Sequence, residues 1–372
     1  MTDIAIIGGG LAGLTAAIHL IQAGKTVRLI EKKQYPQHKV CGEYISAEVL
    51  PYFKQLGVDL QNIQPDHVQR FRLHAPSGRY VESKLPLGGI GIRRYTLDHY
   101  LYQYAQKLGV QFDLNTRIDQ VKFKEDQFYL SSKKGQFFAA KVVLASFGKR
   151  SNLDVNLKRP FVQNPAAYVG VKFYLDNDFP KDLVSLYNFA EGYAGAVRVE
   201  DGSADIAYLC QAKQLQNHGS IEALEKEVLY KNPAIKDLFN AGKRSPEKPI
   251  AISNVSFLPK QQIEQHMLMI GDAAGMIPPL AGNGMAMGIH GAKIAAECSL
   301  AFLNKQLDRS SLERQFTQRW RAQFSKRLFW GRRLHRVMGK PLISELAVRT
   351  LIQTPALLPP IIKQTHEKPI SS

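Results

Sequence analysis

The chain begins with apolar runs separated by glycine-rich turns. Residues 4–7 (IAII) form a short apolar run, the glycines of GGGLAG follow it, and a stretch rich in small and apolar residues extends to Gly24. This order predicts a buried strand, a tight turn and a helix. A second apolar run in TVRLIEKK predicts the next strand, so the N-terminal segment is expected to form a βαβ unit.

The same pattern returns at residues 266–303, where HMLMIGD is followed by a glycine-rich loop and a helix of small residues. Between these ends, from about residue 155 to 260, alternating and β-rich runs are separated by turns such as EDGS. Alternation of this kind is typical of an antiparallel sheet. The sequence therefore predicts an α/β fold, in which a Rossmann-like nucleotide-binding domain carries an inserted antiparallel β-sheet and C-terminal helices follow.

Positive charge is concentrated toward the C-terminal end of the chain. The net charge is +17 over 372 residues, and residues 309–340 contain ten Lys or Arg against one acid, Glu313, interleaved with aromatic and leucine residues. A large positive charge favours an anionic partner. One interpretation is a solvated helix that packs its apolar stripe on the protein; the other is a helix that contacts an anionic membrane. No motif for a nucleic-acid partner is present.

Cysteine and histidine spacing exclude other classes of site. Cys41, Cys210 and Cys298 lie far apart without a CxxC pair, which disfavours disulfides and zinc, and the histidines show no ligand spacing, so no metal is expected. The N-terminus does not resemble a secretory signal, and no apolar run is typical of a membrane span. We expect a cytoplasmic protein, with peripheral contact at the inner face of the membrane through the basic C-terminal region.

The glycines of the first turn have the spacing of a dinucleotide site. Gly8, Gly10 and Gly13 form GxGxxG, and Glu31 follows eighteen residues after Gly13, at the end of the second strand. The glycines allow close approach of a pyrophosphate to the helix N-terminus, and an acid at this place accepts hydrogen bonds from ribose hydroxyls. The pattern predicts an adenosine diphosphate group without a 2′-phosphate, as in FAD or NAD. Asp272 can bind a polyol in the same way.

Three motifs together resemble one family. GGGLAG with Glu31, RYTLDHYL, and GDAAGMIPPLAGNGMAMG are similar to FAD-dependent oxidoreductases of the para-hydroxybenzoate hydroxylase-type fold, a group that includes geranylgeranyl reductases, flavin monooxygenases and halogenases. The resemblance implies a GR2-type flavoprotein. It implies an FAD-binding domain of residues 1–155 and 255–305 with part of the substrate region near 65–95, an antiparallel-sheet substrate domain of residues 156–254, and a basic helical region of residues 306–372.

The resemblance also implies which residues hold FAD. It assigns the pyrophosphate to the first turn, the ribose to Glu31 and the ribityl chain to Asp272. It assigns the flavin ring edge to the backbone at residues 284–286. Arg94 is expected near the flavin or its phosphates, with an ion pair to Asp98 as the alternative. The full set is Gly8, Gly10, Leu11, Ala12, Gly13, Glu31, Lys32, Arg94, Ile118, Gly148, Gly271, Asp272, Gly282, Gly284, Met285 and Ala286.

Two departures from the family affect the expected electron donor and reaction. Phe147 stands where the hydroxylases carry an acid, which disfavours an NADPH-using hydroxylase and leaves Lys149 and Arg150 as candidates for pyrophosphate contact. No second GxGxxG unit is present, so electrons are expected from transient NAD(P)H docking or from a separate reductase. The tryptophan signature of the halogenases is also missing, which disfavours halogenation.

The stretch HKVCGEYIS supplies the candidate catalytic residues Cys41, Glu43 and Tyr44. Cys41 is interpreted as a wall of the active site that tunes or shields the flavin, with simple packing as the alternative, and Glu43 and Tyr44 as proton carriers. Aromatic residues of the middle segment are the candidate walls of a pocket for a small lipophilic substrate, although ordinary sheet packing is the commoner use of such residues. They are Tyr168, Phe173, Tyr187, Phe189, Tyr193 and Tyr208.

Two reactions are compatible with these features. The compact chain and the basic tail favour a monooxygenase that hydroxylates a lipophilic aromatic or polyketide-type substrate. The alternative is reduction of C=C bonds in a prenyl lipid, since KVCG is similar to the Lys-Pro-Cys-Gly stretch of geranylgeranyl reductases, with Val40 in place of proline. A protein that binds flavin without catalysis is disfavoured.

Overall fold

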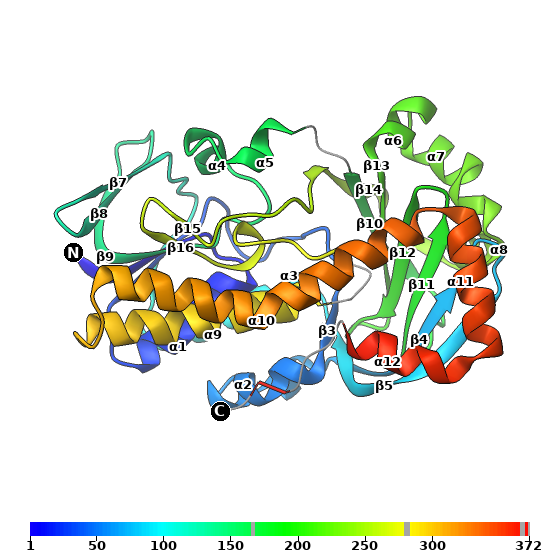
Figure 1. Ribbon diagram of the computed structural model, residues 1–372, viewed down its shortest axis with the longest axis horizontal. Coiled ribbons are helices and arrows are strands. Elements are labelled where there is room, and N and C mark those ends of the chain that lie inside the picture. The colour runs from blue at the N-terminus through cyan, green and yellow to red at the C-terminus, as the bar shows by residue number, and fades with distance from the viewer. Residues whose placement is uncertain (165–167, 279–282, 365–368, 371–372) are drawn as a thin grey trace.

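The computed structural model describes residues 1–164, 168–278, 283–364 and 369–370, and it contains two eight-stranded sheets (Figure 1). The first sheet contains strands from both of the separate segments that the sequence assigned to a nucleotide-binding domain. Its parallel strands lie in the order β16 (Met267–Met269), β9 (Phe137–Ala145), β1 (Thr2–Ile7), β2 (Val27–Ile30) and β6 (Gln111–Asp113). Strand β15 (Ile263–Glu264) and the hairpin of β7 (Gln120–Lys124) and β8 (Gln127–Ser131) complete it by antiparallel pairing.

Small residues bring helices close to this parallel sheet. Helix α1 (Leu11–Gln22) and helix α9 (Gly284–Leu303) lie side by side, and helix α3 (Arg94–Lys107) packs against α1. A Cβ atom at Gly288 of α9 would lie 3.6 Å from the Cβ atom of Ala12. Because the central strand β1 is buried between its neighbours, its four residues from Ile4 to Ile7 are apolar.

The second sheet is antiparallel apart from one pair of strands. Its order is β14 (Lys243–Val255), β10 (Tyr168–Asp176), β13 (Ala204–Gln211), β12 (Gly192–Arg198), β11 (Leu183–Phe189), β4 (Asp66–His74), β5 (Tyr80–Gly91) and β3 (Tyr44–Ser46). Strands β11 and β4 run parallel. Helices α6 (Ala212–His218), α7 (Ile221–Glu227) and α8 (Pro233–Asn240) cover the face that points away from the first sheet. The α/β fold expected from the sequence is confirmed.

The C-terminal helices bridge the two sheets (Figure 1). Helix α10 (Arg309–Met338) crosses the molecule along α9, and α11 (Pro341–Gln353) and α12 (Leu358–Lys363) follow it onto the second sheet. The apolar stripe of α10 is buried; it comprises Leu312, Phe316, Trp320, Phe324 and Leu328. The short helices α2 (Leu50–Gln55), α4 (Asn152–Asn156) and α5 (Pro160–Gln163) lie in connections. Among the described residues, we find no helix with the length and hydropathy needed to cross a bilayer.

Candidate functional site

One cavity of about 720 Å³ lies where the two sheets meet. It runs from the first turn after β1, past the ends of β2 and β9, to the inner face of the second sheet. In a parallel α/β sheet, ligands bind outside the carboxyl ends of the strands, which is the edge that this cavity follows. Most residues that the sequence assigned to a cofactor line the cavity: Gly8, Gly10, Leu11, Ala12, Glu31, Lys32, Arg94, Ile118, Gly148, Gly271, Asp272, Gly284 and Met285.

The first turn shows why its glycines are needed. Gly8 has a φ of +105°, and a Cβ atom there would lie 2.4 Å from the carbonyl oxygen of Ser146. A Cβ atom at Gly13 would lie 2.2 Å from the carbonyl oxygen of Gly8, so Gly13 serves helix packing and does not line the cavity. Gly10 occupies the N-cap of α1 and has no side chain to cap it. The first N–H groups of α1 are therefore available to an anion.

Glu31 lies at the carboxyl end of β2, on the cavity wall. Its carboxylate accepts hydrogen bonds from the N–H of Gly9 at 2.7 Å and from the N–H of Lys33 at 3.0 Å. These two bonds fix the carboxylate beside the glycine turn, and each oxygen keeps a further lone pair for a ligand. This placement suits the ribose contact that the sequence predicts.

Arg94 reaches the cavity, but its guanidinium is already engaged. Its Nε and Nη2 atoms donate to the two carboxylate oxygens of Asp98, both at 2.7 Å, and Lys39 forms a further ion pair with Asp98 at 3.0 Å. Burial alone would raise the pKa of Asp98, but Arg94 and Lys39 lower it overall. The ion pair that the sequence left as the alternative is therefore present, and it leaves an excess of positive charge beside the cavity.

The segment after β16 forms a further wall of the cavity, and Gly271 within it lies against Ala12 of α1. Asp272 also lines the cavity, and burial raises the pKa of this carboxyl group. Lys260 Nζ donates to the backbone carbonyls of Lys149 and Asp272, and burial lowers the pKa of Lys260 to about 8. Ala286 is fully buried and does not line the cavity, while Gly282 lies outside the described residues.

The segment of residues 41–44 closes the side of the cavity next to the second sheet. Burial raises the pKa of the Cys41 thiol, so this thiol stays protonated at neutral pH. Glu43 has a φ of +45°, and its carboxylate accepts from the N–H of Arg94 at 2.8 Å and from the Tyr174 hydroxyl at 3.0 Å. The hydroxyl of Tyr44 donates to the carbonyl of Gly88 at 3.2 Å, so it serves the β3–β5 contact.

Behind Glu43 lies a buried cluster of charge. Lys172 Nζ of β10 is 2.5 Å from Glu43 and 3.2 Å from Asp205 of β13, and the three side chains are almost completely shielded from solvent. Burial disfavours the charge on Lys172, but Asp205 and Glu43 raise its pKa overall. Burial also raises the pKa of both carboxyl groups against the opposing effect of Lys172. The cluster can store a proton next to the cavity.

Only some of the aromatic residues expected as pocket walls line the cavity. Tyr193 lines the cavity, and Tyr168 lies one layer behind, against Phe257 and His335. Phe173, Tyr187 and Phe189 do not line it, because their positions alternate to the opposite face of the sheet, in the core under α6–α8. Tyr208 lies at the edge of the cavity. Its hydroxyl donates to Glu225 of α7 at 3.0 Å, and its side chain belongs to the core under α6–α8.

The sequence reasoning missed Lys172, Asp205 and Tyr174. The available signal was a single lysine in the middle of the apolar run YVGVKFYLD, since a charge in a buried strand needs a partner. The apolar cavity walls were missed as well, and they come from several strands, from the connection after β14 and from the segment after β16. They are Phe71, Leu85, Val184, Leu186, Leu209, Ile250, Ile252, Val255, Phe257, Met276 and Ile277.

The residues present fit FAD. An uncapped helix N-terminus, the Glu31 carboxylate and the buried Asp272 carboxylate line one continuous cavity, and they suit the pyrophosphate, the adenosine ribose and the ribityl chain, respectively. Phe147, Lys149 and Arg150 line the same cavity, although Lys149 Nζ donates to the carbonyl of Ser253. Phe147 offers no carboxylate at this place in the cavity.

Comparison with known proteins agrees with this geometry. The profile of the family described as FAD binding domain matches residues 1–324. Digeranylgeranylglycerophospholipid reductase 2 of Methanopyrus kandleri is 22% identical over 366 residues, covering 92% of this chain and 88% of that protein. Conditioned medium factor receptor 1 of Dictyostelium discoideum is 24% identical over 362 residues, covering 87% of this chain and 68% of that protein.

Solved structures share the fold. The halogenase PltM superposes with a TM-score of 0.78 at 15% identity, covering 97% of this chain and 82% of that chain. PqsL of P. aeruginosa, solved in complex with 2-aminobenzoylacetate, superposes with a TM-score of 0.73 at 16% identity, covering 92% of this chain and 98% of that chain. At such identities, the likeness defines the fold alone.

Proposed function

This chain belongs to the FAD binding domain family, and we propose that it is an oxidoreductase that uses FAD to reduce a carbon–carbon double bond in a long apolar substrate such as an isoprenoid chain. When bound and reduced, a flavin supplies either a hydride to an alkene or, with molecular oxygen, an oxygen atom to an activated aromatic ring. The two outcomes require different surroundings for the substrate.

The apolar end of the cavity carries the proposal. Its walls on the second sheet are aliphatic or aromatic from Phe71 on β4 to Val255 on β14, and Met276, Ile277 and Ile362 continue them. Apolar walls bind a hydrocarbon chain without leaving polar groups unpaired. The sequence similarity to digeranylgeranylglycerophospholipid reductases supports the same substrate class.

The chain's own residues supply the proton and exclude water. Alkene reduction adds a hydride to one carbon and a proton to the other, and Cys41 holds a proton at Sγ on the cavity wall. Glu43, Lys172 and Tyr174 form the adjoining network through which that proton can be replaced. Electrons reach the flavin from NAD(P)H docking transiently or from a separate reductase.

Hydroxylation of a lipophilic aromatic or polyketide-type compound is the second candidate. Glu43 favours it, because a carboxylate whose pKa burial raises is a suitable base for a phenolic proton. Phe71, Tyr193 and Phe257 also offer aromatic surface to such a ring. Oxygen insertion therefore remains a candidate reaction at the same site.

A single experiment separates the two reactions. The protein is reconstituted with FAD, reduced with dithionite, and mixed either with geranylgeraniol under argon or with a long-chain alkylresorcinol under isotopically heavy molecular oxygen. We expect the polyprenyl alcohol to gain two hydrogen atoms by mass spectrometry without oxygen. Incorporation of isotopically heavy oxygen into the resorcinol, with no reduction of the polyprenyl alcohol, would contradict alkene reduction. Failure to retain FAD would contradict both reactions.

A further inference from the structure

Helix α10 separates the cavity from the solvent with a single layer of helix. On its inner side, Gly331 contacts Ile277, Arg332 Nε donates to the carbonyl of Phe257 at 3.0 Å, and the His335 ring packs against Tyr193 and Phe257. Ile277, Tyr193 and Phe257 all line the cavity. The outer side of the same turns is therefore the protein surface nearest to the apolar end of the site.

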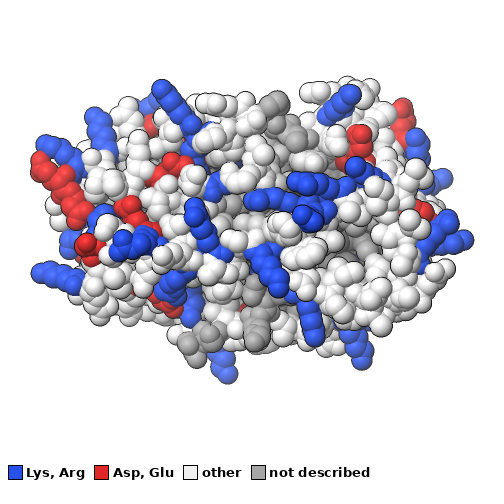
Figure 2. All heavy atoms as spheres, viewed as in Figure 1, with Lys and Arg blue, Asp and Glu red and all other residues white. Residues whose placement is uncertain are grey.

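That outer side is basic and aromatic. Its residues recur at helical spacing opposite the buried stripe, and we call them the α10 outer stripe: Lys326, Phe329, Trp330, Arg333, Arg336 and Lys340. Phe329 and Trp330 are 48% and 37% exposed, and the Arg333 guanidinium lies 4.4 Å from the centre of the Phe329 ring. Residues 326–344 contain six Lys or Arg and no acid. Figure 2 shows Lys and Arg gathered along the middle of this face, with Asp and Glu mainly toward its ends.

Helix α11 continues the surface with exposed aliphatic residues. Leu342 and Leu346 are 87% and 67% exposed, and Ile343 beside them is also exposed. Ser344, Val348 and Leu351 are buried, so the helix keeps Leu342 and Leu346 on its outward side. Three aliphatic side chains next to a cationic stripe are costly to leave in water and need an apolar partner.

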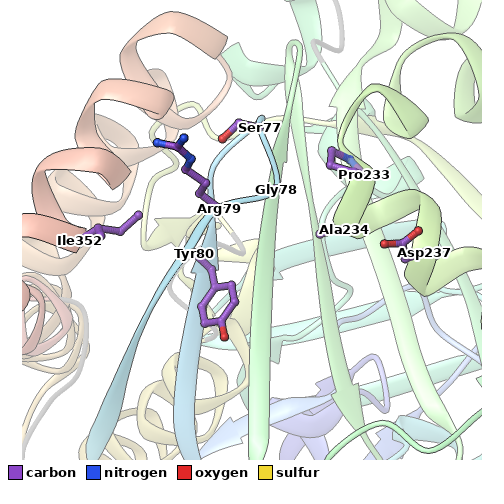
Figure 3. Close-up of a pocket in the computed structure, with 8 residues that line it drawn as sticks. All are labelled: Ser77, Gly78, Arg79, Tyr80, Pro233, Ala234, Asp237 and Ile352. Atoms are coloured by element: carbon purple, nitrogen blue, oxygen red, sulfur yellow. The ribbon is translucent and has the colours of Figure 1, made fainter.

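The orientation of α11 is fixed by its contact with the turn between β4 and β5. Glu345 accepts from the N–H of Ser77 at 3.1 Å and from its hydroxyl at 2.9 Å, and Arg349 donates to Glu345 at 2.8 Å. Figure 3 shows this turn, with Ser77 and Arg79, and Ile352 of α11 extending toward it at an open hollow. The contact holds one side of α11 to the protein.

We propose that the α10 outer stripe and the exposed residues of α11 dock on an anionic lipid bilayer. Cations attract acidic lipids by about 1 kcal/mol for each Lys or Arg near the surface, and aromatic rings favour the depth of the headgroups. Leu342, Ile343 and Leu346 then enter the acyl region. A nucleic acid would pair with the cations but would leave these aliphatic residues exposed. The surface places the membrane one helix away from the apolar end of the cavity.

Vesicle co-sedimentation of the FAD-loaded full chain tests the docking. We expect binding to vesicles that contain phosphatidylglycerol and little binding to phosphatidylcholine alone. The double variant Arg333→Glu, Arg336→Glu should weaken binding about tenfold or more. The variant Leu342→Ser, Leu346→Ser should weaken it without changing the net charge. The matched control is Lys133→Glu, Lys134→Glu, because these exposed residues between β8 and β9 are not part of the α10 outer stripe and undergo the same charge change.

Trp330 gives an independent measurement that does not depend on folding of a charge variant. Brominated phosphatidylglycerol should quench Trp330 but not Trp320, which is 5% exposed, so quenching should disappear in Trp330→Phe. No vesicle binding, equal weakening by the control, equal binding to neutral vesicles, or tighter binding to a nucleic acid than to vesicles would each overturn the proposal. These readouts are independent of activity, so failure of the proposed reaction does not affect them.

Discussion

At the scale of single residues, the site depends on buried charges that compensate one another. Lys172 is fully buried and is held by Glu43 and Asp205, and Glu43 also binds the Tyr174 hydroxyl and the N–H of Arg94. A buried ion pair adds little net stability, but removing one partner leaves an unpaired charge that is costly. The cluster thus ties the segment of residues 41–44 to the second sheet.

The variant Lys172→Met should lose stability, and the size of the loss should depend on pH. We expect a loss of about 3–5 kcal/mol in the free energy of unfolding at neutral pH. Without Lys172, the folded-state pKa values of Glu43 and Asp205 rise further above their unfolded values, so the folded state binds more protons than the unfolded state. Stability then falls as pH rises through these pKa values. Urea unfolding should therefore show a smaller loss in the free energy of unfolding, relative to the wild type, at about pH 5 than at about pH 8. A larger loss at about pH 5 would contradict the role of Lys172 in compensating the two carboxylates.

Cys41→Ser should separate a role in the reaction from packing. A serine hydroxyl fits the same space but is a much weaker acid than the thiol, so turnover should fall by about 100-fold if Cys41 supplies the proton. FAD content and the urea midpoint should remain near those of the wild type. The control Cys210→Ala removes a buried thiol on the far face of the second sheet and should leave turnover unchanged. If Cys41→Ser changes only the stability and not the turnover, Cys41 has a packing role.

Glu31→Gln should weaken FAD binding while leaving the fold intact. The carboxylate is held by Gly9 and Lys33 and faces the cavity, and hydrogen bonds to a charged group are worth about 1.5–3 kcal/mol. We expect the Kd for FAD, measured by flavin fluorescence, to rise about 10- to 100-fold. The same change at Glu125, an exposed residue of the β7–β8 hairpin, is the control. An unchanged Kd would place the ribose elsewhere.

At the scale of elements, α10 covers α9 and also packs behind residues that line the cavity. Gly331 allows this close approach, because a Cβ atom there would lie 2.9 Å from Ile277 Cγ1. The small residues of α9 have a related role, but Gly291 has more room, with its nearest neighbour, Trp320 Nε1, 3.8 Å from a Cβ atom. The two helical glycines therefore differ in what an added methyl group meets.

Gly331→Ala and Gly291→Ala form a matched pair. Alanine favours a helix over glycine by up to about 1 kcal/mol at either position. At Gly331, the methyl group forces Ile277 or α10 to shift, and overpacking of this kind costs about 1–3 kcal/mol. Urea unfolding should show a loss for Gly331→Ala and no loss, or a gain, for Gly291→Ala. Equal effects would mean that α10 adjusts its position freely.

The strands of the second sheet show where sequence prediction ends. Alternation in YVGVKFYLD places Lys172 and Phe173 on opposite faces, but it does not say which face meets the cavity. That choice depends on α6–α8, which cover one face, and on residues 41–44, which cover the other. The predicted aromatic walls Phe173, Tyr187 and Phe189 were wrong for this reason. The glycine turn and Glu31 were predictable, because their spacing along the chain is that of a strand, turn and helix that bind a dinucleotide.

At the scale of the whole molecule, the chain passes between the two sheets four times. Strands at residues 2–30, 111–145 and 263–269 belong to the first sheet, and strands at residues 44–91 and 168–255 belong to the second. The cavity lies at the junction and takes residues from both sheets. A ligand that fills it contacts strands far apart in the sequence, so its binding energy should stabilise both sheets.

Hydrogen exchange with and without FAD tests this coupling. Ligand at about 100 times its Kd adds about 2.7 kcal/mol to the free energy of unfolding, which slows amides that exchange only by global opening about 100-fold. We expect this slowing in β1 of the first sheet and equally in β10 and β13 of the second, because residues of both sheets line the cavity. At the same FAD concentration, Glu31→Gln should show proportionally less slowing in both. If FAD slows amide exchange only in β1 and its neighbours, the second sheet opens independently. Ligand binding in the cavity would then not couple the stability of the two sheets.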